Sequence, residues 1–242
     1  MCKDFAVGVD NYVQTLAARS PSRVLITVPH DGVHGLELEP FVPRRINGTV
    51  LHDGAVWPIV RDAIGAYPVN VVRGLMSRRF LDYNRAPEDA FELPQFEALY
   101  QKYHGAIYVH LQQMLRHSAQ EELLLLDVHG FSNQPPYAPR DGYDLILGTG
   151  NRETILHGAP DEAFAEFFRQ RGYSVFLPKT QAQTAQDDWL NGNFTVRTVA
   201  RELGVNAIQV EIARRFRVRD AAVIGTRLSA DLAAFLEQQY RR

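Results

Sequence analysis

Two histidines in this chain follow apolar segments closely, a placement that suits metal ligation. In RVLITVPHDGVH the apolar run leads to His30, and in EELLLLDVHGF a second apolar run leads to His129. A catalytic zinc site commonly takes three protein ligands, often including histidine, and leaves a further position for water. The two histidines therefore favour a catalytic metal site, although two unrelated loop histidines would give the same pattern.

A carboxylate is needed to complete such a site, and the sequence offers four candidates. Asp53 stands just before an expected helix, where it could equally serve as the N-cap. Glu37 forms an H-x-x-E pair with His34, which is a known spacing for metal ligands. Asp31 and Asp127 lie next to the two histidine motifs. The residues alone leave the choice open.

Glu211 is the candidate proton acceptor. It interrupts the apolar segment of NAIQVEIARRFR near its carboxyl end. A carboxylate in that position is costly unless it has a partner or a task, and partial desolvation raises its pKa toward the range of a general base. A structural ion pair with Arg214 or Arg215 is the alternative interpretation.

A third polar cluster, SRRFLDYNRAPED, packs Arg78, Arg79, Asp82, Asn84 and Arg85 into a short stretch of the chain. A guanidinium matches a carboxylate through two parallel charge-assisted hydrogen bonds, and a neighbouring asparagine adds further donors. The cluster therefore indicates a small acidic substrate. The alternative is a solvated loop with structural ion pairs, such as one between Asp82 and an arginine.

The elements that must position these residues alternate along the chain. Continuous apolar runs predict strands that are buried on both faces of a sheet, at residues 23–28, 69–73, 123–128, 145–147, 174–177 and 207–212. Helical patterns lie between them and at the end of the chain, at residues 57–66, 95–117, 161–170, 193–203 and 229–240. This order predicts an α/β fold of three layers, with a mixed, mostly parallel sheet and helices on both faces. The polar clusters are then expected beyond the carboxyl ends of the strands.

Composition narrows the classes of function. The 242 residues are 45% hydrophobic and suit one domain over residues 1–242, and a net charge of -2 disfavours nucleic acid and anionic membranes as partners. The lone cysteine, Cys2, leaves no internal disulfide and no core thiol nucleophile, so a cytoplasmic location is expected. The motifs of serine hydrolases and of P-loop nucleotide hydrolases do not occur. The sequence does not determine the oligomeric state.

Taken in order, VPHDG, SRRFLDYNR, LLLDVHGF, DLILGT and IQVEIARRFR resemble the motifs of the N-formylglutamate amidohydrolase family. That family is similar to the zinc carboxypeptidases and aspartoacylases, which share an α/β fold with a mixed sheet. The resemblance implies one Zn²⁺ per chain, although manganese or cobalt would suit the same ligands. It identifies His30, Asp53 and His129 as the metal ligands, while the H-x-x-E spacing keeps Glu37 as the fallback carboxylate.

The resemblance also assigns the other roles. It implies that Glu211 is the general base, that Arg78 polarises the scissile carbonyl, and that Arg85 with Asn84 grips a substrate carboxylate. Two departures concern the substrate: the chain has DVHG where the family has D-x-H-S, and DWLNGNFTVRT replaces a glycine-rich segment. We therefore expect a zinc-dependent amidohydrolase that acts on a small N-acylated amino acid such as N-formylglutamate. A carboxypeptidase that acts on peptides or cell-wall fragments, and a non-catalytic module that binds acidic metabolites, are the alternatives.

Overall fold

The computed structural model describes residues 5–9, 12–38, 44–46, 48–179, 190–218 and 222–240. Within these ranges the strands form one sheet of eight, in the spatial order β1-β2-β4-β3-β5-β8-β6-β7. The strands are β1 (Phe5–Val9), β2 (Val13–Ala18), β3 (Val24–Val28), β4 (Asn70–Gly74), β5 (Leu124–Phe131), β6 (Leu145–Gly148), β7 (Val175–Phe176) and β8 (Asn206–Ala213).

The centre of the sheet is parallel. Strands β4, β3, β5 and β8 are neighbours and run in the same direction. The flanks are mixed, because β2 pairs antiparallel with β4 and with β1, β6 pairs antiparallel with β8, and β6 runs parallel to β7. The carboxyl ends of the four central strands therefore meet at one edge of the sheet, where the segments that follow them lie close together.

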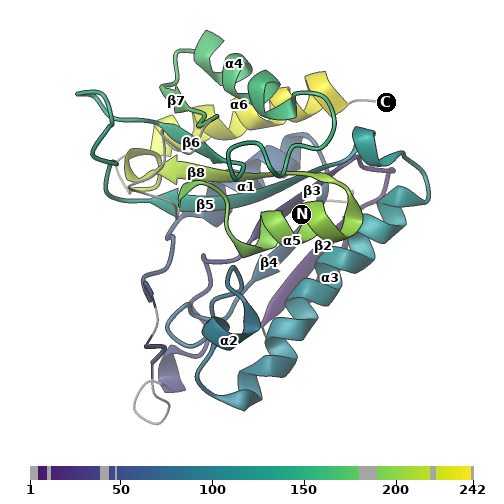
Figure 1. The fold of residues 1–242 in the computed structure, drawn as a ribbon, viewed down its shortest axis with the longest axis vertical. Helices are drawn as coiled ribbons and strands as arrows, with labels where there is room; N and C mark the ends of the chain where they lie inside the picture. Colours follow the sequence, from purple (N-terminus) through teal and green to yellow (C-terminus); the bar gives the residue numbers. More distant parts are fainter. Residues whose placement is uncertain are drawn as a thin grey trace.

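Helices cover both faces of the sheet (Figure 1). Apolar side chains of α1, α4 and α6 pack in one core, which contains Ile26 and Leu126 of the sheet. Those of α3 and α5 pack in a second core on the opposite face, with Leu25 and Leu125. The helices are α1 (Val56–Ala66), α2 (Pro87–Ala90), α3 (Glu97–Leu115), α4 (Pro160–Gln170), α5 (Phe194–Leu203) and α6 (Ala222–Tyr240).

Local sequence explains the two elements that matter most for the site. Every residue of β5 except Gly130 is buried, as its apolar run predicts for a strand that is covered on both faces. Helix α3 buries Tyr100, Tyr103, Ile107 and Leu111, which recur at intervals of three or four residues and so form one face.

The expected α/β fold is confirmed, and each predicted strand and helix has a counterpart. The sequence reasoning missed the hairpin of β1 and β2, because β2 buries only two of its six residues and lacks a continuous apolar run. It also missed the one-turn helix α2 and placed the start of α6 seven residues too late, at Ser229 rather than Ala222. No helix among the described residues has the length and apolar character needed to span a bilayer.

Candidate metal centre and active site

The sheet brings the predicted chemical residues to one edge. His30 follows β3 by two residues, and His129 lies near the end of the neighbouring strand β5. Glu211 of β8 is the direct register partner of His129. Because paired residues of adjacent strands project from the same face, the His129 and Glu211 side chains leave the sheet side by side.

Three buried side chains converge as a possible metal site: His30, Asp53 and His129. The Nδ1 atoms of the two imidazoles are 3.0 Å apart, and Asp53 Oδ2 lies 3.3 Å from each of them. Ligands placed 2.0–2.1 Å from a tetrahedral metal are about 3.3 Å from one another. The triangle formed by these three atoms, called the metal triangle below, therefore has the size that one divalent ion requires.

Each imidazole is also bound on its far side by a buried carboxylate. His30 Nε2 lies 2.6 Å from Asp82 Oδ1, and His129 Nε2 lies 2.8 Å from Asp127 Oδ2. These contacts favour a proton on Nε2, which turns the Nδ1 lone pair of each ring toward the triangle. Two imidazole lone pairs and a carboxylate oxygen then face one another, so the donor set suits a cation at the centre.

The charged groups around the triangle also favour a cation at its centre. Burial penalises charge on His129, but the carboxylates of Asp127, Asp53 and Glu211 outweigh burial and hold the pKa of His129 well above its usual value. Burial likewise penalises the Asp53 carboxylate, but its interactions with His129 and His30 outweigh burial and lower the pKa of Asp53. The site thus stabilises positive charge between its carboxylates.

The other carboxylate candidates take different positions. Asp127 stands behind His129 and also accepts a hydrogen bond of 2.6 Å from Thr27 Oγ1. Asp31 pairs with Arg73, at 3.1 Å. Glu37 lies exposed in a 3₁₀ turn (Leu36–Leu38) and is not part of the cluster of potential ligands found among the described residues.

Asp82 is the centre of a buried ionic network. Besides His30, its carboxylate accepts hydrogen bonds from Arg45 Nη2 at 3.1 Å, Arg78 Nε at 2.9 Å and Arg85 Nε at 3.3 Å. Burial opposes the charge of Asp82, but His30, Arg78 and Arg45 hold its pKa well below the usual range. The structural ion pair considered for Asp82 is therefore present, and it fixes both a potential metal ligand and the two arginines of the predicted site.

Arg45 is a residue of this network that sequence reasoning missed. Its side chain is buried and also donates to the carbonyl oxygens of Thr49 at 2.7 Å, Asp89 at 3.1 Å and Arg78 at 3.3 Å. Its neighbour Arg44 is exposed. Because the two arginines are adjacent in the same short segment, no local signal separates them.

Glu211 is buried beside the metal triangle. Gln209, two residues earlier on the same face of β8, donates from Nε2 to Glu211 Oε1 at 2.9 Å. Burial raises the pKa of the Glu211 carboxyl to about 7. A carboxyl with such a pKa can accept and return a proton near neutral pH. Gln209 could have been found from the i, i+2 spacing of two polar residues in an otherwise apolar strand.

The predicted substrate-binding pair divides between two environments. Asn84 is buried: its Nδ2 lies 3.2 Å from His129 Nε2 and 3.4 Å from Gln209 Oε1, and its Oδ1 accepts the backbone N–H of Thr195 at 2.9 Å. The Arg85 side chain is 35% exposed, and its Nε contacts the Asp82 carboxylate. An ideal Cβ on Gly48 would come within 2.2 Å of Arg85 Nη2, so the Gly48 backbone packs directly on this guanidinium.

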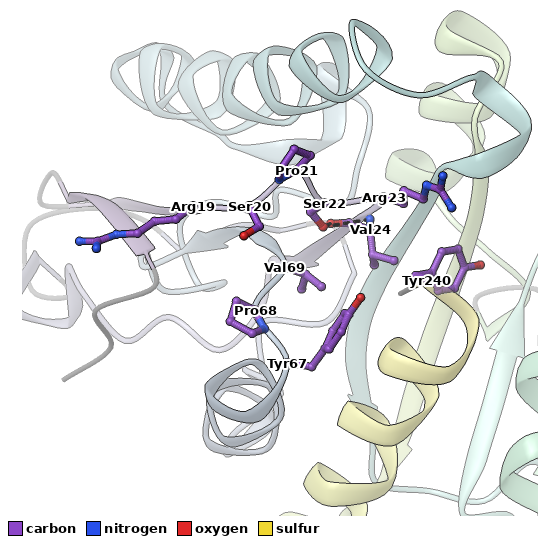
Figure 2. Close-up of a pocket in the computed structure, with 10 residues that line it drawn as sticks. All are labelled: Arg19, Ser20, Pro21, Ser22, Arg23, Val24, Tyr67, Pro68, Val69 and Tyr240. Atoms are coloured by element: carbon purple, nitrogen blue, oxygen red, sulfur yellow. Dashed lines mark hydrogen bonds between the residues drawn. The ribbon is translucent and has the colours of Figure 1, made fainter. Parts of the chain in front are cut away.

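A cavity of ≈ 840 Å³ opens at this edge of the sheet. Asp53 and Arg78 line it beside the metal triangle, and its described lining also includes Arg85, Arg197, Phe131 and Phe194. A smaller cavity of ≈ 290 Å³ lies at the opposite edge, where β3 and β4 begin. Figure 2 shows Tyr67 and Tyr240 beside the segment 19–24 there, and none of the predicted site residues lines it.

Comparison with known proteins gives a family match and structural matches. The model of the family described as N-formylglutamate amidohydrolase matches residues 93–217, more than half of the chain, and this range contains His129 and Glu211. An N-formylglutamate amidohydrolase from Ralstonia eutropha JMP134 is similar in fold, with a TM-score of 0.66 at 15% identity over 94% of this chain and 99% of that one. A gene product of Agrobacterium tumefaciens matches with a TM-score of 0.61 at 14% identity, over 95% of this chain and 93% of that one. No curated protein matches the sequence.

Proposed function

Because the chain belongs to the N-formylglutamate amidohydrolase family, we propose that it hydrolyses the amide bond of a small N-acylated acidic amino acid such as N-formylglutamate. We further propose that this hydrolase depends on one divalent metal ion, zinc by preference, held by His30, Asp53 and His129. Glu211 and Arg78 are the proposed catalytic residues, and Arg85 with Asn84 forms the proposed substrate site.

The observation that carries the proposal is the triangle of two Nδ1 atoms and one carboxylate oxygen, each imidazole backed by its own carboxylate. Carboxylates behind metal-binding histidines set the tautomer and raise the basicity of the ring. A divalent cation supplies Lewis-acid chemistry there, because it polarises a carbonyl and makes water more acidic.

The side chains around the triangle can transfer the proton and stabilise the negative charge that develops on the carbonyl oxygen. Glu211 accepts the proton of the attacking water and returns it to the leaving nitrogen, a task that suits a buried carboxyl with a pKa of about 7. Arg78 lines the cavity, and its Nη1 lies 3.6 Å from Asp53 Oδ1. Its guanidinium can therefore donate to the carbonyl oxygen of the substrate as negative charge develops there. The hydrogen bond from Arg78 Nε to Asp82 holds the guanidinium in place.

Substrate orientation is the task that we assign to Arg85. Its guanidinium lines the cavity, with Nε on Asp82 and the Gly48 backbone packed against Nη2. A guanidinium fixed in this way can hold a carboxylate with little loss of rotamer freedom. Within the predicted pair, we assign Asn84 a supporting role: its amide contacts His129, Gln209 and the Thr195 backbone, and so helps to hold these residues in place.

The size of the cavity favours a second candidate, a peptidase. A volume of ≈ 840 Å³ lies in the upper part of the ~300–1,000 Å³ range that suits drug-sized ligands, and a formylated amino acid is smaller than these. A short acidic peptide with a terminal carboxylate on Arg85 would fill more of the space.

Amine release from a panel of substrates tests the proposal and separates the two candidates. The panel contains N-formylglutamate, N-acetylglutamate, N-formylglutamine and an α-glutamyl dipeptide, each with added zinc. We expect the highest kcat/KM for an N-acylglutamate. An Arg85→Met variant should raise the KM for that substrate by about 10–100-fold, because one hydrogen bond to a charged group contributes about 1.5–3 kcal/mol.

The matched control is Arg61→Met, which removes an exposed arginine paired with Asp62 on α1. It should leave KM within twofold. Preferential cleavage of the dipeptide would favour the peptidase, and no amine release from any member of the panel would contradict both candidates.

A further inference from the structure

Arg217 connects three separate segments of the backbone. It follows a 3₁₀ turn after β8 (Arg214–Phe216), and each nitrogen of its guanidinium donates to a backbone carbonyl. The acceptors are the carbonyl oxygens of Ile212 (3.0 Å, from Nε), Gly54 (2.8 Å, from Nη1) and Phe131 (2.9 Å, from Nη2).

These carbonyls belong to the segments that carry the active site. Each lies within two residues of a proposed site residue, namely Glu211, Asp53 and His129 respectively. The planar guanidinium of Arg217 therefore connects the segments of the proposed proton acceptor, the proposed carboxylate ligand and a proposed histidine ligand. These segments come from three distant parts of the chain. Removing this side chain would leave carbonyls without their partner and free the three segments to move apart.

The position of Arg217 depends on a glycine in β5. An ideal Cβ on Gly130 would lie 2.3 Å from Arg217 Cζ and 2.4 Å from its Nε. Gly130 does not have a left-handed φ, so the backbone conformation does not require glycine. The absence of a side chain is needed for space: the guanidinium occupies the place that a side chain at position 130 would take. The Gly130 N–H also donates to Asp53 Oδ2, at 3.2 Å.

Arg217 approaches the site at Gly130, which itself lines the substrate cavity. Gly130 is the neighbour of His129 on the strand, so the two positions face opposite sides of the sheet. Residue 217 does not line the ≈ 840 Å³ cavity. Its influence on the site therefore passes through the backbone carbonyls that it holds and through its charge, which interacts with Asp53 and Glu211.

We propose that Arg217 is a positioning residue that sets the spacing of Asp53, His129 and Glu211, and that Gly130 is present to admit it. The proposal deepens the proposed function and rests on it for the metal. It explains why DVHG ends in glycine: a residue with a side chain at this position would expel the guanidinium that ties the site together.

A double-mutant cycle on zinc affinity tests the pair, with Gly130→Ala, Arg217→Ala and the double variant measured by competition with a chelator. Loss of groups that orient metal ligands typically costs 10–100-fold in affinity, so we expect each single variant to bind zinc about tenfold more weakly. In the double variant we expect no further loss, because the alanine at position 130 harms the site only by displacing Arg217. Arg217→Lys should recover only part of the affinity, because a lysine lacks the planar fork.

Arg215→Ala is the matched control. Arg215 lies two residues away and pairs with Asp144 and the Asp141 carbonyl rather than with a proposed site residue, so zinc affinity should stay within twofold. Circular dichroism verifies that each variant is folded.

Hydrogen exchange of the Gly130 amide, measured without metal, gives a second readout that does not depend on the proposed function. Exchange should accelerate in Arg217→Ala and Gly130→Ala, and no more in the double variant. Additive losses of affinity, or unchanged exchange in Arg217→Ala, would overturn the proposal. If the parent protein binds no zinc, the proposed function fails, and the exchange measurement still decides whether Arg217 holds the segments together.

Discussion

At the scale of single residues, the site depends on the partners behind the chemical groups. Asp82 and Asp127 orient the two imidazoles, and Gln209 donates to the carboxylate of Glu211. All three partners are buried, so solvent does not compete with these contacts. The geometry of the proposed reacting groups is therefore fixed without a substrate, which is the condition for effective electrostatic catalysis.

Substitution of Glu211 tests the proposed proton transfer directly. Glu211→Gln keeps the size of the side chain and an oxygen that can accept from Gln209, but it cannot accept a proton. We expect kcat to fall by about 10²–10⁴-fold, the usual contribution of general acid–base catalysis, with zinc content unchanged. Steady-state kinetics alongside metal analysis measures both quantities. Near-normal turnover in the metal-loaded variant would refute the proton-transfer role.

At the scale of elements, the segment before α1 and helix α3 support the site from different sides. Gly48 packs on the Arg85 guanidinium, and the Thr49 carbonyl accepts from Arg45, so the segment that leads to Asp53 is tied to the ionic network. Helix α3 reaches the same network through Tyr100, whose hydroxyl donates to the Arg85 carbonyl at 2.7 Å. The position of Arg85 thus depends on two elements that are far apart in sequence.

The buried His104 of α3 makes the attachment of this helix sensitive to acid. Its Nε2 lies 2.9 Å from the Tyr83 carbonyl, and burial lowers the pKa of His104 to about 4. The unfolded chain protonates this histidine near pH 6.5, so the folded state loses stability as the pH falls from about 6.5 through 4. We expect a loss of about 3 kcal/mol from this residue over that range. His104→Gln should remove most of that dependence, as measured by urea unfolding at pH 7 and pH 4.5; an unchanged difference between the two pH values would contradict the assignment.

At the scale of the whole molecule, a bound metal would act as a cross-link between distant segments. His30 follows β3, Asp53 precedes α1 and His129 lies in β5, so the three residues meet only when the sheet is formed. A ligand that binds the native state alone stabilises it by about 2.7 kcal/mol at a concentration one hundred times its Kd.

Thermal unfolding with and without zinc measures this linkage. For a chain of this size, that stabilisation corresponds to a rise in Tm of about 5–10 °C. His30→Ala should abolish the rise, and magnesium should produce little of it, because magnesium prefers sites built from oxygen ligands. An equal rise in the His30→Ala variant would show that zinc acts elsewhere on the chain.

Local patterns in the sequence predicted the sheet and the candidate residues. Each apolar run that ends in polar residues became a strand of the sheet, because burial on both faces requires such a run. The order of the motifs pointed to the family that the match over residues 93–217 identifies. The hairpin of β1 and β2 escaped this reasoning, because β2, which pairs with β4, carries no continuous apolar run.

The partners of the site residues were decided only by the tertiary structure. Asp53 rather than Glu37 meets the two histidines, Asp127 stands behind His129, and Arg45 rather than Arg44 enters the network. The sequence by itself determined which residues could do the chemistry, since residue type and strand ends are local properties. Which carboxylate faces which histidine depends on contacts such as that between Thr27 and Asp127, one hundred positions apart, and only packing of the complete sheet sets those distances.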